Sequence, residues 1–136
     1  MDRIPALLPL LALAACIFPS SPPPAPVNRA PVVAWAEAGC TWDPYAYDWV
    51  WWFDAEVGDP DGLADVWEVY ADVIDEWNGE IADSFLLESW GDGYWSTEWF
   101  QYQTWLDCRY GPYLVEFVAY DVYEAYDVYA TYPYQG

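Results

Sequence analysis

Carboxylates are the most frequent reactive side chains in this sequence, and two groups of them fall in loops that we expect at one end of the molecule. Asp59 and Asp61 lie in the turn "GDPDG", and Asp121, Glu124 and Asp127 lie in and around a later turn, "DVYEAYD". Clustered carboxylate oxygens are the ligands that a hard cation such as Ca²⁺ requires. The four aspartates are therefore the candidate calcium ligands, although aspartate is also common in tight turns for purely conformational reasons.

The same carboxylates do not indicate an enzyme. The chain has no histidine and no lysine, so Ser-His-Asp, Cys-His and His-metal chemistry are excluded by composition. A pair of acids can hydrolyse glycosides, but no other catalytic signature accompanies them in this acidic chain. We therefore expect a non-catalytic protein that has no cofactor, with Ca²⁺ as the one candidate.

The charge balance is strongly acidic. Asp and Glu total 23 against three arginines, for a net charge of -20. Such a surface repels phosphate backbones, so nucleic acid is not an expected partner. Acidic disordered chains are poor in aromatic residues, whereas this one has 11 Trp, 13 Tyr and 56% hydrophobic residues over 136 positions. These values predict one folded domain with a short appendage.

Aromatic residues divide between two expected roles. Those on the apolar side of alternating segments are expected in the core: Trp49, Trp51, Phe53 and Trp67. Those on the polar side are candidate ligand-binding residues: Trp52, Tyr70 and Tyr120. Exposed Trp and Tyr rings are platforms on which sugars or protein partners pack, so a protein or a glycan is the expected ligand.

A lone cysteine stands where an apolar run meets a proline-rich run in "LALAACIFPSSPPPAP". Residues 1–15 have the proportions of an export signal and are too short to span a bilayer. Leu13-Ala14-Ala15-Cys16 resembles the lipobox of bacterial lipoproteins. The resemblance implies cleavage before Cys16, acylation of Cys16 and attachment to a bacterial membrane, the outer membrane being favoured, with the domain facing the periplasm or the cell surface. The alternative is an ordinary secretory signal in which Cys16 is incidental.

The segment 16–31 is expected to be a tether. Its serial prolines favour extended polyproline II, which would hold a domain at 32–136 away from the membrane. If lipid occupies the sulfur of Cys16, Cys40 and Cys108 remain as a pair in an exported protein. Strand parity places the loops that contain them at one end, opposite the aspartates, and predicts a disulfide between them. Two free buried thiols are the alternative.

Period-two alternation of apolar residues predicts β-strands that must position these groups. The turn signals "GDPDG", "WNGE" and "WGDGYW" separate them. The predicted strands cover residues 32–38, 48–57, 63–75, 80–88, 94–106, 113–121 and 126–132. A helix over "ADVWEVYADVIDEW" is an alternative that the β-branched and aromatic content disfavours. An all-β, two-sheet antiparallel sandwich of about seven strands is therefore the predicted fold class.

Two segments, "FDAEVGDPDGLADV" and "YLVEFVAYDVYEAYDV", resemble the immunoglobulin-like and cadherin-like sandwich domains of bacterial surface proteins. The resemblance implies an immunoglobulin-like fold, a surface or adhesive role and no enzymatic activity, and its cadherin-like part favours calcium. The function predicted from sequence is a membrane-anchored envelope lipoprotein that displays a non-catalytic interaction or structural module. A carbohydrate-binding module that uses exposed Trp and Tyr is the alternative.

Overall fold

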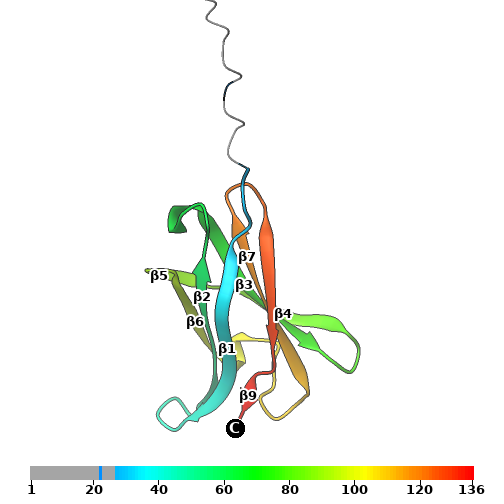
Figure 1. Cartoon of the computed structure of the whole chain (residues 1–136). Coiled ribbons are helices and arrows are strands. Elements are labelled where there is room, and N and C mark those ends of the chain that lie inside the picture. The colour runs from blue at the N-terminus through cyan, green and yellow to red at the C-terminus, as the bar shows by residue number, and fades with distance from the viewer. Residues whose placement is uncertain (1–21, 23–26) are drawn as a thin grey trace, which may run out of the picture.

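A computed structural model of the chain describes residue 22 and residues 27–136, so the predictions for the lipobox, for Cys16 and for most of the tether lie outside the described residues. The described chain is an all-β sandwich of two sheets, as predicted (Figure 1). Its strands are β1 (Val32–Asp43), β2 (Asp48–Gly58), β3 (Val66–Asp75), β4 (Glu80–Leu86), β5 (Glu88–Gly91), β6 (Tyr94–Phe100), β7 (Tyr113–Asp121), β8 (Tyr126–Thr131) and β9 (Tyr134–Gln135). Two short 3-10 turns are η1 (Leu63–Asp65) and η2 (Gln101–Gln103).

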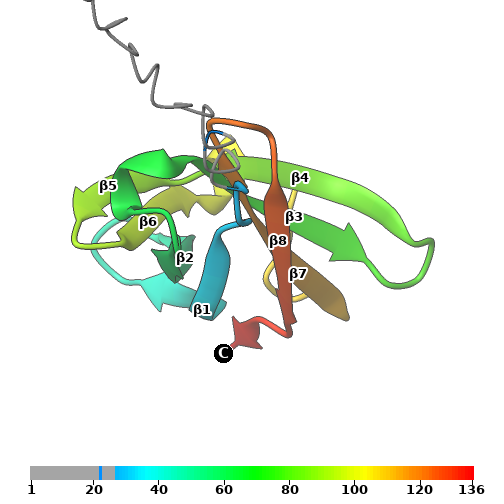
Figure 2. The ribbon, with the colours of Figure 1, turned by 45° about the horizontal axis from the view of Figure 1, so that its top comes forward.

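One sheet has the strand order β5-β6-β2-β1-β9 and the other has the order β4-β3-β7-β8. Antiparallel hairpins join β1 to β2, β3 to β4, β5 to β6 and β7 to β8. This pairing, with β2 and β6 adjacent in one sheet and β3 and β7 adjacent in the other, is the strand order of immunoglobulin-like sandwiches. Figure 2 shows the two sheets as separate layers.

The core lies between the sheets and follows the predicted alternation. Fully buried residues recur at every second position of three central strands: Trp51, Phe53, Ala55 and Val57 in β2, Val69, Ala71 and Val73 in β3, and Val115, Phe117 and Ala119 in β7. Tyr113 at the start of β7 accepts a hydrogen bond from the Asp107 backbone N–H at 3.3 Å, an arrangement like the tyrosine corner of immunoglobulin-like domains.

The strand count differs from the prediction because one expected strand is divided between the two sheets and a short strand is added near the C-terminus. Leu87 still donates its N–H to the Val69 carbonyl of the four-stranded sheet at 2.8 Å, whereas Glu88 pairs with Ser96 in the five-stranded sheet. The predicted strand 80–88 is therefore β4 followed by the start of β5. The predicted strand 63–75 begins with η1, the predicted strand 94–106 gives way to η2 after Phe100, and a short β9 adds the last strand.

The prediction that Trp67 belongs to the core was wrong, because its side chain is 58% exposed. Val66 lies opposite Asp121 of β7, but Glu68 already lies opposite Tyr120. Trp67 is thus the extra residue of a β-bulge, which reverses the alternation at that point. Strict period-two counting across residues 66–69 assigned Trp67 to the wrong face.

The predicted disulfide is present between Cys40 and Cys108, whose Cα atoms are 6.0 Å apart. Cys40 was expected in a loop after the first strand, but β1 continues to Asp43 and contains it. Cys40 also pairs with Gln135 of β9, near the C-terminus and away from the end at which the chain enters the sandwich (Figure 1). The bond joins the five-stranded sheet to the connection that leads into β7 of the other sheet.

Candidate functional site

The outer face of the four-stranded sheet, which points away from the core, carries a groove lined by aromatic and acidic side chains. A row of neighbours crosses three strands, because Glu68 of β3 lies opposite Tyr120 of β7 and Tyr120 lies opposite Tyr126 of β8. The ring centroids of Tyr120 and Tyr126 are 5.8 Å apart with the planes inclined at 45°. Strand alternation places this row outside, since Val69 and Ala119, the next residues along β3 and β7, are buried.

Two positions with irregular backbone complete the groove, whose volume is about 350 Å³. The bulge turns the side chain of Trp67 outward beside Glu68. Bulges commonly redirect a side chain in this way. Glu124, in the turn between β7 and β8, adopts a φ of 67°, a region that non-glycine residues seldom occupy. We refer to the residues that line this hollow as the aromatic groove: Trp67, Glu68, Tyr120, Glu124 and Tyr126.

Among the described residues, no basic side chain lines the aromatic groove beside its two carboxylates. The whole chain has only Arg3, Arg29 and Arg109 as cationic residues. In the part of the chain that the structure describes, Arg29 pairs with Asp61 at 3.1 Å and Arg109 lies 3.9 Å from Asp107. The groove therefore combines aromatic faces with uncompensated negative charge.

Tyr70 borders the aromatic groove and fixes one of its acids. The Tyr70 hydroxyl donates a hydrogen bond to Glu68 Oε2 at 2.9 Å. This bond to the carboxylate, together with desolvation and the charge of Glu68, raises the pKa of Tyr70 above its ordinary value. Tyr70 also meets Tyr120 edge to face, with centroids 6.4 Å apart and planes at 82°.

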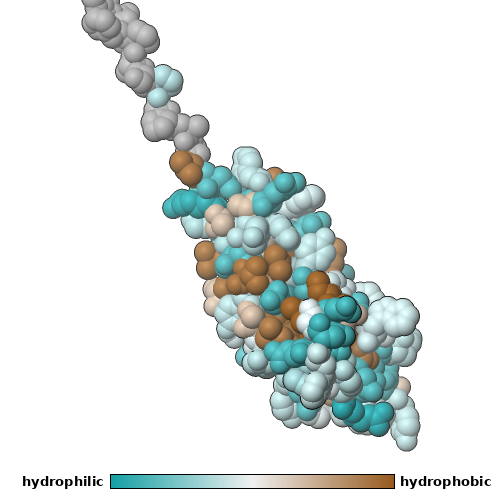
Figure 3. All heavy atoms as spheres, turned by 90° about the vertical axis from the view of Figure 1, so that its right-hand side faces the viewer, coloured by the Kyte–Doolittle hydropathy of each residue, from teal (hydrophilic) through white to brown (hydrophobic). Residues whose placement is uncertain are grey.

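The surface beyond Tyr70 is apolar. Tyr70 of β3 lies between Leu86 of β4 and Val118 of β7. Val118 in turn lies opposite Val128 of β8. The outermost members of this row, Leu86 and Val128, are exposed. Figure 3, which views the molecule from the side where β4 lies in Figure 1, shows hydrophobic side chains gathered in the middle of this face with hydrophilic ones around them. The apolar row adjoins the aromatic groove, because Val118 lies two residues along β7 from Tyr120.

Of the three predicted ligand-binding aromatics, the structure brings Tyr70 and Tyr120 together and places Trp52 elsewhere. Trp52 lies on the outer face of the five-stranded sheet, opposite Gly39 and Glu98. Its indole covers Gly39 so closely that a Cβ atom added there would lie 2.6 Å from Cζ2 of Trp52. Trp52 is half-buried by this contact, and its first role is to cover a glycine.

At the end where the chain enters the sandwich, Asp121 is fully buried. Its carboxylate accepts hydrogen bonds from Asn28 Nδ2 at 2.7 Å and from the backbone N–H groups of Tyr123 and Ala125 at 2.9 Å each. Burial raises the pKa of Asp121, but these three donors outweigh it and hold the pKa below its usual value. Asn28 therefore contacts the sandwich although it precedes the domain boundary expected at residue 32.

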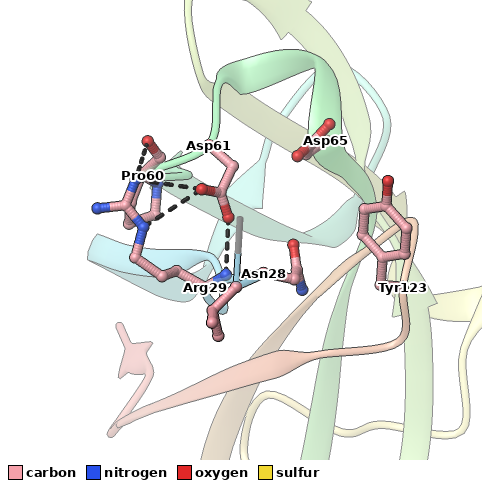
Figure 4. Close-up of a pocket in the computed structure, with 7 residues that line it drawn as sticks. Asn28, Arg29, Pro60, Asp61, Asp65 and Tyr123 are labelled. Atoms are coloured by element: carbon pink, nitrogen blue, oxygen red, sulfur yellow. Dashed lines mark hydrogen bonds and ion pairs between the residues drawn. The ribbon is translucent and has the colours of Figure 1, made fainter. Parts of the chain in front are cut away.

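Arg29 makes a second contact at this end, shown in Figure 4. Its backbone N–H donates to Asp61 Oδ2 at 2.7 Å, its Nε and Nη2 donate to Asp61 Oδ1 at 3.2 and 3.1 Å, and Nη2 also donates to the Pro60 carbonyl at 2.9 Å. The backbone hydrogen bond from Arg29 is the largest cause that lowers the pKa of Asp61. Asp65 and Tyr123 line the same hollow of about 430 Å³.

The four aspartates predicted as calcium ligands do not converge. Carboxylate oxygens of Asp59, Asp61 and Asp65 lie within 4.8 Å of one another, and Asp65 was not among the predicted ligands. Asp127 instead accepts a backbone N–H of β1 at 2.9 Å, and Asp121 is occupied by the donors just described. Calcium binding at this end stays a prediction, and it would compete with Arg29 for Asp61.

Sequence reasoning missed four members of the aromatic groove: Trp67, Glu68, Glu124 and Tyr126. Trp67 was missed because bulges have no clear signal in one sequence. Glu124 was noted only among the loop acids. Tyr126 alternates outward with Val128 and Ala130, so its position beside Tyr120 follows from the β7–β8 hairpin register and was accessible from sequence.

In the described part of the chain, no helix has the length and hydrophobicity needed to cross a membrane. Comparison of the sequence and structure with family models, curated proteins and solved structures finds no match.

Proposed function

We propose that this chain is a bacterial envelope lipoprotein, anchored through Cys16, whose non-catalytic β-sandwich binds a partner with the outer face of its four-stranded sheet. The observation that carries the proposal is the surface formed by the aromatic groove and the adjoining apolar row, with exposed side chains in both parts. Contiguous apolar surface rimmed by polar groups is typical of interaction sites on proteins of this size.

The way the chain enters the domain supports an anchored display module. Asn28 and Arg29, at the end of the proposed tether, are held by Asp121 and Asp61. The C-terminus and β9 lie at the other end (Figure 1), and the disulfide lies there too because Cys40 pairs with Gln135 of β9. A tether fixed at this point would hold the sandwich end-on to the membrane, so that the outer sheet faces stay open to a partner.

The ring geometry favours a partner that fills a shaped surface over a flat sugar stack. Tyr70 and Tyr120 are inclined at 82°, and Tyr120 and Tyr126 at 45°. A coplanar strip, the usual platform for successive sugar rings, is not formed by these side chains. Exposed aliphatic neighbours such as Leu86 and Val128 instead extend the apolar surface beyond the rings, and a protein partner can cover such a surface.

A carbohydrate-binding module is the second candidate, and one hollow on the other side of the sandwich favours it. Trp52, Tyr132, Tyr134 and Glu37 border a depression of about 340 Å³ between β1 and the β8–β9 connection. Aromatic rings beside a carboxylate suit the apolar face and hydroxyls of one sugar. Glycan-array binding that is lost with Trp52→Ala would favour this function.

The anchor is tested by metabolic labelling with a fatty-acid analogue. The wild type should take up the label and sediment with membranes, and Cys16→Ser should lose the label and leave the membrane fraction or remain unprocessed. Ala14→Gly, which keeps a small residue before the cysteine, serves as the matched control and should be labelled. A wild-type protein that carries no label and begins at a residue other than 16 would overturn the anchor.

The binding face is tested with a photo-crosslinking amino acid in living cells. Val128 on the four-stranded sheet and Thr41 on the five-stranded sheet both have exposed side chains on outer faces. Replacement of Val128 should produce a discrete adduct, and replacement of Thr41 should not. Adducts from Thr41 alone would place the binding face on the other sheet.

A further inference from the structure

We propose that the aromatic groove binds a small alkylammonium cation such as choline. This inference rests on the proposed function, because it names the ligand chemistry of the same outer face. Three aromatic side chains from two strands and a bulge, Trp67, Tyr120 and Tyr126, line one hollow of about 350 Å³. The faces of Trp and Tyr rings attract organic cations, and quaternary ammonium groups are bound in this way by clusters of aromatic residues.

Charge selects a cation over a neutral ligand of the same shape. Glu68 and Glu124 line the groove with the three rings, and no Lys or His exists in the chain to neutralise them. The hydrogen bond from Tyr70 fixes one oxygen of Glu68 at the groove. A net charge of -20 also raises the local concentration of cations and opposes ligands that carry a phosphate or carboxylate.

The donor set distinguishes an organic cation from a metal ion. Hard cations such as Ca²⁺ bind six to eight oxygen atoms, whereas this groove presents two carboxylate side chains among ring faces. A large, weakly hydrated alkylammonium group instead gains from ring contact on several sides and from carboxylates at a distance. The groove is therefore matched to a ligand that is both apolar and positively charged.

The bulge at Trp67 and the positive φ at Glu124 both place side chains in the aromatic groove. A regular β3 would turn Trp67 into the core, and the bulge presents it to solvent beside Glu68. A glycine would adopt the φ of 67° at position 124 without strain, yet the residue there is a glutamate. Sparsely populated backbone conformations cluster at ligand sites, where the surrounding structure sustains them.

Calorimetric titration of the purified full chain with choline chloride tests the proposal, with NaCl of equal ionic strength as the reference. Choline and tetramethylammonium should bind saturably. The neutral isostere 3,3-dimethylbutan-1-ol should bind at least about tenfold more weakly, because it lacks the charge that the rings and carboxylates attract. Phosphocholine should also bind more weakly than choline, since its phosphate meets the acidic surface.

Matched variants locate the site. Trp67→Ala should weaken choline binding about tenfold, whereas Trp105→Ala, which removes another indole that is 87% exposed and lies outside the groove, should leave it unchanged. Glu124→Gln keeps the shape and removes a charge, and it should weaken binding of choline but not of the neutral isostere. Far-ultraviolet circular dichroism of each variant establishes that the sandwich is folded.

Equal binding of choline and its neutral isostere would overturn the proposal, as would equal losses in Trp67→Ala and Trp105→Ala or the absence of any saturable choline binding. None of these results would affect the Cys16-dependent label or the Val128 adduct. Failure of the cation site and failure of the proposed function are therefore distinguishable.

Discussion

On the outer face of the five-stranded sheet, Trp52 covers Gly39, and Glu37 lies directly opposite Asp54. On the outer face of the four-stranded sheet, Trp67 stands beside an open groove that has acids at its edge. The two faces use the same residue types, indole and carboxylate. On the five-stranded sheet the backbone around Trp52 is regular, and the indole packs on Gly39. On the four-stranded sheet a bulge turns the indole of Trp67 toward solvent, where it can contact a ligand.

The difference teaches that aromatic content alone does not mark a binding surface. An indole above a glycine fills space that a Cβ would otherwise occupy, so it contributes to stability. An indole at a bulge has little packing to lose and is available for recognition. Stability and ligand binding should therefore respond to substitutions on different faces.

The largest expected effect on stability comes from removing the disulfide between Cys40 and Cys108. Replacing Cys40 and Cys108 together with alanine should lower the free energy of unfolding by about 2–4 kcal/mol, because a cross-link over 68 residues is lost. Choline affinity should be unchanged where the protein remains folded. Urea unfolding and calorimetry measure the two quantities. If choline affinity falls together with the free energy of unfolding, the aromatic groove depends on the disulfide, and stability and ligand binding are not separate properties.

Gly39→Ala should destabilise the five-stranded face by about 1–3 kcal/mol through overpacking. The new Cβ would lie 2.6 Å from Cζ2 of Trp52 and 3.0 Å from the Tyr134 carbonyl oxygen, so the rigid indole must move. Gly58→Ala is the matched control, because nothing lies within 4 Å of a Cβ there. Equal melting temperatures for the two variants would mean that Trp52 is not packed as described.

Glu37→Gln should raise the free energy of unfolding by about 0.2–1 kcal/mol, because it removes a like charge directly across from Asp54. The gain should shrink in concentrated salt, which screens exposed charges. Glu98→Gln is the control on the same face, since Glu98 lies opposite Trp52 and not opposite an acid. A larger gain from Glu98→Gln would contradict this reading of the register.

The smallest effect concerns the Tyr70–Glu68 hydrogen bond at the groove. The pKa of Tyr70 is raised in the folded protein, so the bond stabilises the fold below the ordinary tyrosine pKa of about 10 and is lost as pH rises through the folded-state value. Tyr70→Phe should flatten this alkaline loss slightly, as followed by melting temperature against pH. An unchanged profile in the variant would show that the bond carries no stability.

Much of the fold was predictable from sequence, because the alternation of apolar residues and the turn residues directly indicate the local backbone conformation. The buried positions of β2 and β7 and the turns follow from such local signals, and the cysteine pair follows from the cysteine count and the alternating direction of the strands. The change of sheet at Leu87 was not predictable, since one continuous run of residues supplies strands to two sheets. That change depends on which neighbour each strand finds, and a single sequence does not encode it locally.

The candidate site was less accessible for a related reason. The extra residue Trp67 reverses the alternation of inward and outward side chains in β3, and no residue type near it indicates a bulge. The buried role of Asp121 depends on Asn28, which is 93 residues away and was assigned to the tether. Tyr70 and Tyr120 were placed correctly outside because their strands are regular around them.

The most direct test of the account is an indole N–H nuclear magnetic resonance spectrum of the ¹⁵N-labelled full chain titrated with choline. The signals of Trp67 and Trp52 are assigned with Trp67→Phe and Trp52→Phe. We expect the Trp67 signal to move saturably while the Trp52 signal stays fixed. A saturable shift of Trp52 with Trp67 unmoved, equal shifts of both, or no shift of either would contradict it.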